Sequence, residues 1–195
     1  LSVDSAESLL NIMFFYPHRY DLAKVGRDKF NKKLHFKNRI KGQILAEDVV
    51  DETTGEILAE AGTKIDKELA TTLQNAAVPF VMIQAEDRNY KVLSNLMVDL
   101  AAYVDFDPKE AGVTELVYYP VLKTILEEAG DDQEELKKLV HKNITELIPK
   151  HITKDDIIAS INYNMHLEGG IGTPDDIDHM GNRRIRAVGE LLKTQ

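Results

Sequence analysis

The residues best suited to chemistry lie together near the end of the chain. Positions 175 to 186 read Asp-Asp-Ile-Asp-His-Met-Gly-Asn-Arg-Arg-Ile-Arg, so three carboxylates and three guanidinium groups fall within twelve residues. Carboxylates at this density could hold Mg²⁺ or Ca²⁺, but the run lacks the spaced ligands and final Glu of a calcium-binding loop. Helix capping and pairing with the neighbouring arginines are therefore the favoured roles for Asp175 and Asp176.

Two features close to this run have both a chemical and a structural interpretation. His179 could act as a general base, but no Ser, Cys or orienting third residue accompanies it, so a structural histidine is favoured. A hydrolase would need a pocket that gathers Asp175, Asp178 and His179. The Gly169-Gly170-Ile171-Gly172 run follows a predicted helix and lacks the Gly-Lys-Ser/Thr ending of a phosphate loop, which favours a turn.

Two helices are predicted before residue 40. Asp4 or Ser5 can cap the first, and Pro17 ends it. The second runs from about residue 21 to 34 and leaves several cations nearer solvent, namely Lys24, Arg27, Lys32 and Lys33. Contact with phosphates and a solvated face both remain open for this basic helix. A further hypothesis pairs Arg27 with a carboxylate of residues 175–178.

Two more helices are predicted after residue 150. Thr153 with Asp156 forms a capping box that starts a helix from Asp155 to about Leu167. The apolar residues Ile157, Ile158, Ile161 and Met165 are expected to face the core. The glycines of residues 169–172 end this helix, and a final helix is expected over 184–192.

The middle of the chain reads as a mixture of strands and helices. A strand over 43–50, a turn at 52–55 and a return strand over 56–59 predict a hairpin. A helix capped by Asp66 should run to about residue 75, followed by a strand over 78–83. The apolar residues within 92–104 fit neither the helical nor the strand periodicity. Helices are expected within 116–128, where Pro120 limits the start, and from 131 to about 144.

These elements predict an α+β fold with a discontinuous helical portion. Residues 1–38 and 150–195 are expected to pack together as this portion, and residues 39–149 to form a β-rich insertion module that protrudes from it. The net charge of −9 is unevenly divided along the same lines, with +5 over 1–41, −12 over 42–150 and −2 over 151–195. Because phosphate contacts need clustered Lys and Arg, nucleic-acid binding is expected at the ends and not in the acidic middle.

Composition sets further bounds on the protein. The chain contains no cysteine, which excludes disulfides and thiolate metal sites and is compatible with a reducing cytosol. No apolar run approaches the roughly 20 residues that span a bilayer, and the N-terminus does not resemble a signal peptide. The chain begins at Leu1 without an initiator Met, from which we expect a segment of a longer protein.

Two separate runs closely resemble signatures of the bacterial RNA polymerase β subunit. Residues 175–191 match the pattern DDIDHxGNRRxRxVGEL, with Met180 where Leu is commoner and Ala187 where Ser is commoner. Residues 19–34 match RYDLxxVGRxKxNxKL, in the same chain order as in the family. Residues 40–65 are similar to the external region in its Firmicutes-like form. The resemblance implies that 1–38 and 150–195 belong to the β lobe, with 39–149 as an external module.

The resemblance also implies how this chain takes part in transcription. The parent assembly is a nucleotidyltransferase whose Mg²⁺ is held by the β′ subunit, so this chain is expected to carry no cofactor and no catalytic residue. The implied partners are the β′, α, ω and σ subunits together with promoter and downstream DNA, in the cytoplasm at the nucleoid.

In the family the 175–186 run lies at the downstream fork beside the non-template strand. Carried over by motif, the nucleic-acid-binding residues are Ile177, Asp178, Arg183 and Arg186. Asp178 would accept hydrogen bonds from a guanine edge, Arg183 would support the pocket or meet phosphate, and Arg186 would point towards the fork and inhibitor pocket. The alternative function is a docking surface for a transcription factor on the acidic module.

Overall fold

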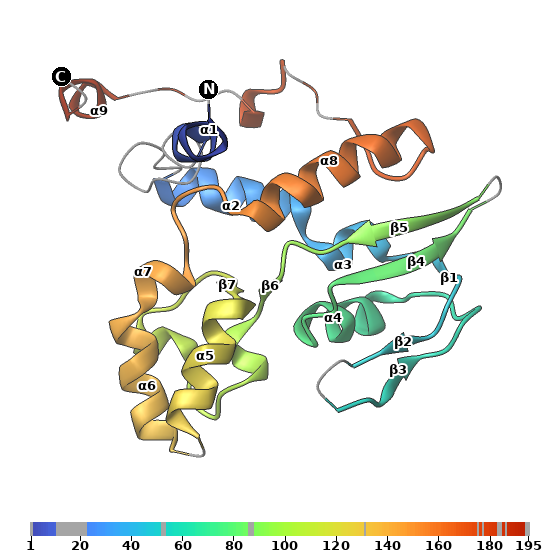
Figure 1. Ribbon diagram of the computed structural model, residues 1–195, viewed down its shortest axis with the longest axis horizontal. Helices are drawn as coiled ribbons and strands as arrows, with labels where there is room; N and C mark the ends of the chain where they lie inside the picture. The colour runs from blue at the N-terminus through green and yellow to red at the C-terminus, as the bar shows by residue number, and fades with distance from the viewer. Residues whose placement is uncertain are drawn as a thin grey trace.

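The computed structural model describes residues 2–10, 23–51, 54–85, 88–130, 132–174, 176, 178–182, 185 and 187–193. Helices alternate with short antiparallel sheets, which confirms the α+β class. Figure 1 shows a mainly helical body and a sheet-containing body beside each other, with α2 and α8 lying across them. None of the helices in these residues is long and apolar enough to cross a membrane.

Within the described residues, three helices precede the first strand. They are α1 (Val3–Leu10), α2 (Ala23–Leu34) and α3 (Phe36–Ile40). The predicted second helix therefore ends at the expected residue, whereas the predicted stop at Pro17 falls outside the described residues. Arg27 was expected near solvent, and that prediction was wrong because its side chain is fully buried.

The sheet-containing body is built on three antiparallel strands in the order β1-β4-β5 (Ile44–Leu45, Phe80–Gln84 and Asn89–Leu93). The register pairs Val81 with Val92 and Ile83 with Tyr90. These alternate residues of β4 and β5 lie on one face of the sheet, and their side chains are buried in the core. Helix α4 (Lys67–Asn75) packs with α3 against this core. The Asp66 side chain accepts from the Leu69 N–H at 2.7 Å and caps α4 as predicted.

The predicted strand over 43–50 divides into two strands with different partners. Strand β1 pairs with β4, whereas β2 (Val49–Val50) pairs with β3 (Ile57–Ala59) to make the expected hairpin. Between them the chain bends, and the Asp48 carboxylate accepts from the Ala61 N–H at 2.7 Å. A run of apolar residues does not reveal such a change of partner, because both halves bury alternate side chains.

The helical body forms around a second core. It contains β6 (Met97–Val98) paired with β7 (Val117–Tyr118), and the 3-10 helices η2 (Leu100–Ala102) and η3 (Pro108–Ala111). Helices α5 (Tyr119–Ala129), α6 (Gln133–Lys142) and α7 (Ile144–Leu147) complete it. Pro120 lies in the first turn of α5, where its missing N–H costs nothing. The Asp132 carboxylate caps α6.

Helix α8 (Lys154–Glu168) contacts both α2 and β5 (Figure 1). Its capping box is present, since the Thr153 hydroxyl and the Asp156 carboxylate each accept from the other's N–H. The predicted core face was wrong at three of its four residues, because Ile158, Ile161 and Met165 are 51%, 57% and 62% exposed, whereas Ile157 is half-buried. The buried residues are instead Asp156, Ala159 and His166, and polar contacts described below hold that face inward.

The last elements within the described residues are the 3-10 helix η4 (Met180–Asn182) and α9 (Val188–Lys193), which starts later than the predicted helix over 184–192. The first core includes Phe36 of α3 and Ile171, from the turn after α8, beside the module's own residues. The boundaries at 38/39 and 149/150 stay predictions.

Candidate functional site

The loop of residues 176–182 places two of the singled-out side chains on the surface. Asp178 is exposed, and its backbone N–H donates to the Asp176 carboxylate at 3.0 Å. His179 is also exposed, and its Nδ1 accepts from the Gly181 N–H at 3.1 Å. The histidine thus shapes the loop, which agrees with the favoured structural role. The other predicted site residues, Ile177, Arg183 and Arg186, lie outside the described residues.

Helix α2 contacts this loop through Lys29 and the turn before it through Lys33. The Lys29 ammonium donates to the Gly181 carbonyl, and the Lys33 ammonium donates to the Thr173 carbonyl at 2.9 Å. The two lysines are four residues apart and therefore project from the same side of the helix. The contact of Lys29 with Gly181 joins the two sequence runs of the resemblance, although the sequence did not single out Lys29 for it.

Arg27 takes part in a different contact from the one predicted. Its guanidinium donates to the Asp156 carboxylate of α8 at 2.6 Å, and both side chains are fully buried. The hypothesis of a pair with residues 175–178 was therefore wrong. Asp156 also accepts from the Asn95 amide at 3.1 Å, and Arg27 contacts the Met97 sulfur at 3.6 Å. One ion pair thus ties α2, α8 and the segment that connects the two bodies.

A second polar cluster holds the other end of α8. Arg39 donates to the Leu93 carbonyl at 2.6 Å and to the Asn162 amide oxygen at 2.8 Å, and Asn162 donates to the Lys91 carbonyl at 2.8 Å. Burial lowers the pKa of Arg39 to about 10, which still leaves it cationic at neutral pH. Sequence reasoning missed this cluster because its members are far apart in the chain.

Tyr163 fixes the turn that leads from α8 to the exposed loop. Its hydroxyl donates to the Thr173 carbonyl at 2.9 Å and accepts from the Thr173 N–H at 3.1 Å. Lys33 and Arg39 lie 5.0 and 5.6 Å from its ring centroid, within the range of cation–π attraction. Gly172 has a φ of +102° and approaches the ring so closely that a Cβ would lie 2.9 Å from it.

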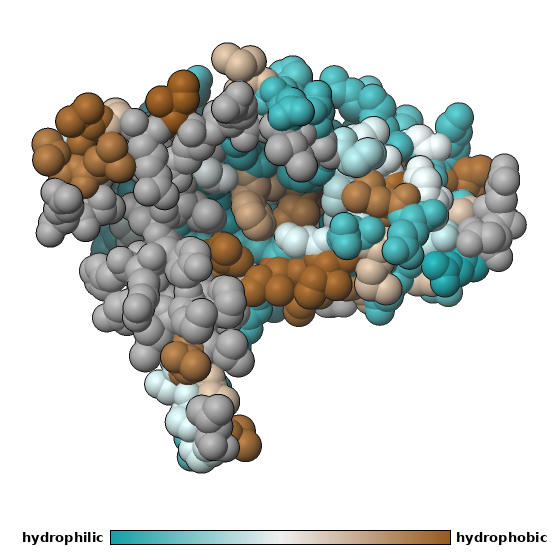
Figure 2. All heavy atoms as spheres, turned by 90° about the horizontal axis from the view of Figure 1, so that it is seen from above, coloured by the Kyte–Doolittle hydropathy of each residue, from teal (hydrophilic) through white to brown (hydrophobic). Residues whose placement is uncertain are grey.

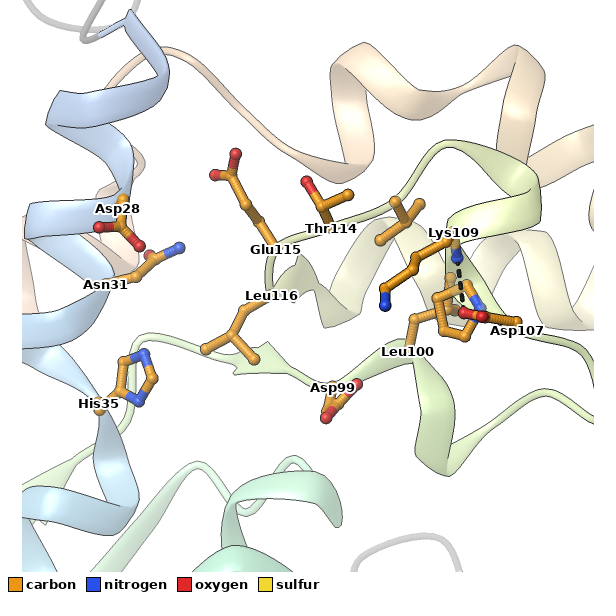
Figure 3. Close-up of a pocket in the computed structure, with 12 residues that line it drawn as sticks. Asp28, Asn31, His35, Asp99, Leu100, Asp107, Lys109, Thr114, Glu115 and Leu116 are labelled. Carbon is orange, nitrogen blue, oxygen red and sulfur yellow. Dashed lines mark hydrogen bonds between the residues drawn. The ribbon is translucent and has the colours of Figure 1, made fainter.

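An acidic cleft of about 400 Å³ separates α2 from the helical body (Figure 3). Its walls carry the carboxylates of Asp28, Asp99, Asp107 and Glu115 around a single lysine, Lys109. Asp107 is engaged as a cap, because it accepts from the Lys109 N–H at 3.0 Å. The cleft gathers neither Asp178 nor His179, so a hydrolase built on those residues has no support from it.

The described carboxylates give no geometric support to the metal interpretation either, and Asp175 lies outside the described residues. Among the residues that the structure describes, no group of three or more His, Cys, Asp or Glu side chains is placed to hold a metal ion. What the loop offers is an exposed carboxylate, a pure hydrogen-bond acceptor, on a loop attached to a basic helix. That arrangement can bind donor groups but supplies no nucleophile with a base beside it.

Comparison with known proteins identifies the family. Residues 114–186 match the family described as RNA polymerase Rpb2, domain 2. Over 195 residues the chain is 53% identical to the DNA-directed RNA polymerase subunit beta of Acetivibrio thermocellus. It is 50% identical to that subunit of Clostridium acetobutylicum and 51% identical to that of Clostridioides difficile, over 194 and 195 residues. The chain belongs to the bacterial RNA polymerase β-subunit family.

The match to these β subunits covers all of this chain but only 16% of the length of each relative. The recognition made from residues 19–34 and 175–191 is thereby confirmed, including its Firmicutes-like form. The alignments also run through the acidic middle of the chain, so the middle as well as the two signature runs is shared with β subunits.

Proposed function

We propose that this segment forms part of the β lobe along the DNA channel of RNA polymerase. In this proposal the loop of residues 176–182 contacts the separated non-template strand at the downstream fork. The observation that carries it is the exposed carboxylate of Asp178, on a loop held to α2 by Lys29. The names of the β-subunit relatives support the assignment to transcription.

The chemistry of Asp178 fits recognition of a base edge. An ionised carboxylate only accepts hydrogen bonds, and guanine presents amino and imino donors when it is unpaired. Bidentate acceptance of such donors is worth about 1–3 kcal/mol of discrimination against the wrong base. In this proposal Ile177 packs beside the base, Arg183 supports the pocket or meets phosphate, and Arg186 points towards the fork and inhibitor pocket.

The role proposed for this segment is non-catalytic. Polymerisation would depend on Mg²⁺ held by the β′ subunit, with the β′, α, ω and σ subunits and promoter DNA as partners, in the cytoplasm at the nucleoid. The exposed face of α8 supports burial in a larger assembly, because Ile158, Ile161 and Met165 are all exposed on it. Figure 2, which views the molecule from above and so from the side of α8, shows a row of apolar side chains on this face. Contiguous apolar patches of this kind mark contacts with other proteins.

The test is reconstitution of the polymerase with Asp178→Ala in the full-length β subunit. Open-complex lifetime and pausing are measured on templates with and without guanine at the downstream-edge non-template position. We expect Asp178→Ala to shorten the open-complex lifetime about tenfold on templates with the guanine and to leave it unchanged on the others. A loss of about 1.4 kcal/mol corresponds to a factor of ten. Glu168→Ala, an exposed carboxylate at the end of α8, is the control. An equal effect of Asp178→Ala on all templates would contradict base recognition.

A second candidate function is docking of a transcription factor on the acidic module. The observation that favours it is an apolar pair on the β2–β3 hairpin, where Val50 and Ile57 are register partners and are 44% and 59% exposed. Polymerase that carries Val50→Ser and Ile57→Ser would then lose its response to the factor while factor-independent elongation stays unchanged. Unchanged responses to all factors tested would remove this candidate.

A further inference from the structure

A second pocket, away from the Asp178 carboxylate, has a strongly basic lining. It has a volume of about 400 Å³ and lies where the end of α2 and α3 face α8 and the turn after it. Four cationic side chains line it, which are Lys32, Lys33, Arg39 and Lys41. Among the described residues no carboxylate lines it, which is unusual in a chain of net charge −9.

The cations divide into a fixed and a movable pair. Arg39 is held by the Leu93 carbonyl and Asn162, and Lys33 by the Thr173 carbonyl, so these two charges are placed before any ligand arrives. Lys32 and Lys41 are exposed, and their long side chains can close over a bound group. The amides of Asn38 and Gln43 add polar groups to the wall. A ligand there needs several acceptor oxygens and negative charge, as a phosphate has.

An apolar pocket adjoins the basic one. It has a volume of about 510 Å³, and the two pockets share Lys33, Tyr163 and Thr173. Its other walls include the apolar side chains of Phe30, Leu34, Leu167 and Pro174. A phosphate site beside an apolar recess suits a ligand that carries a phosphate and a flat apolar group a short distance apart. Free inorganic phosphate would use only the basic half.

We propose that these adjoining pockets bind one nucleotide unit of a single nucleic-acid strand. The phosphate lies among Lys32, Lys33, Arg39 and Lys41, and the base enters the recess beyond Tyr163. This site goes beyond the contact proposed for Asp178, from which it is separate. Single-strand binding sites commonly combine a basic groove with an apolar or aromatic surface for bases.

The experiment titrates the 195-residue chain into a short labelled oligothymidine and follows fluorescence anisotropy at several salt concentrations. Substituting Lys32→Ala and Lys41→Ala together should weaken binding about tenfold and lower the slope of log K against log salt by roughly 1.4, or about 0.7 for each lost contact. Neither lysine side chain donates a described hydrogen bond within the fold, so circular dichroism of the variant should be unchanged. The control is Lys123→Ala with Lys142→Ala, which removes the same charge from exposed positions on α5 and α6.

Two further probes separate the sources of phosphate. An abasic strand of the same length should bind several-fold more weakly than oligothymidine, and inorganic phosphate should compete only at far higher concentration. Equal loss of affinity in the variant and the control would overturn the basic site. Equal binding of the abasic strand, or competition by inorganic phosphate at the same concentration of phosphate groups, would overturn the nucleotide assignment. Oligothymidine carries no guanine, so a failure of binding here and a failure of the guanine-dependent contact proposed for Asp178 are distinguishable.

Discussion

Arg27 and Asp156 form an ion pair of 2.6 Å with no solvent exposure of either side chain, although 129 residues separate them in the chain. Asp156 serves the capping box of α8 at the same time. The pair therefore couples the start of α8 to the middle of α2 and positions both helices relative to the loop that carries Asp178.

Breaking this pair should strongly destabilise the chain. Removing one partner of a buried pair leaves an uncompensated charge and costs about 3–5 kcal/mol. We expect Arg27→Met and Asp156→Asn each to lower the free energy of unfolding by that order in urea titrations. The Asp156→Asn variant keeps an acceptor for the Thr153 N–H, so the stability that it loses comes mainly from the missing negative charge.

The double variant Arg27→Met with Asp156→Asn supplies the control for this prediction. It should be more stable than the sum of the single losses predicts, by roughly 0.5–3 kcal/mol, which is typical of directly coupled residues. Strict additivity would show that the two side chains do not interact in solution.

The turn after α8 should tolerate an alanine at Gly170 better than at Gly172. Both glycines have positive φ, +74° and +102°, but only at Gly172 would a Cβ contact Tyr163. Backbone strain alone costs about 1–2 kcal/mol for an L residue, and the clash adds to it at Gly172. Thermal unfolding of Gly170→Ala and Gly172→Ala, measured side by side, checks the order. A less stable Gly170→Ala variant would contradict the described turn.

Substitutions on the two faces of α8 should have opposite consequences. Ile158→Ser and Ile161→Ser alter exposed positions, so the free energy of unfolding should change by less than about 0.5 kcal/mol. Ala159→Leu introduces a larger side chain at a fully buried position and should cost about 1–3 kcal/mol. A large loss from the Ile158 and Ile161 variants would mean that the predicted core face was right after all.

Stability should fall as the pH drops below neutral, partly through His166. Burial first, and then the charges of Arg39 and Arg88, hold the pKa of His166 below its usual value, and burial does the same for His35 and His151. The unfolded chain therefore takes up protons near pH 6.5 before the folded chain does. This contribution to stability is present above about pH 6.5 and is lost as the pH falls towards the lowered pKa values.

His166→Gln should make this decline shallower by up to one proton. The measurement is the free energy of unfolding by urea at a series of pH values from about 7 to about 5.5. The ring of His166 also packs edge-on against Tyr90, with the two ring centroids 5.4 Å apart, so the variant loses some stability at every pH. The informative quantity is therefore the slope of the free energy of unfolding against pH. If the free energy of unfolding falls with pH as steeply as in the parent chain, protonation of His166 does not contribute to the decline.

Local signals in the sequence determined much of the secondary structure. Asp66 and Thr153 start their helices as predicted, because capping depends on a side chain and an N–H two or three residues away. Helix α6 begins close to the start expected at 131. The β2–β3 hairpin was predictable for the same reason, since its turn is local. The family was readable from residues 19–34 and 175–191, and the contact of Lys29 with Gly181 shows that these two runs meet at α2.

Only the tertiary structure decided which side of each element faces inward. The apolar stripe of α8 predicted a buried face, yet the helix turns Asp156 and Ala159 inward, because Arg27 offers the carboxylate a partner there. The change of partner between β1 and β2, and the cluster around Arg39, likewise depend on segments distant in the chain. Sequence periodicity reports that two faces differ, whereas burial depends on which distant segment packs against each of them.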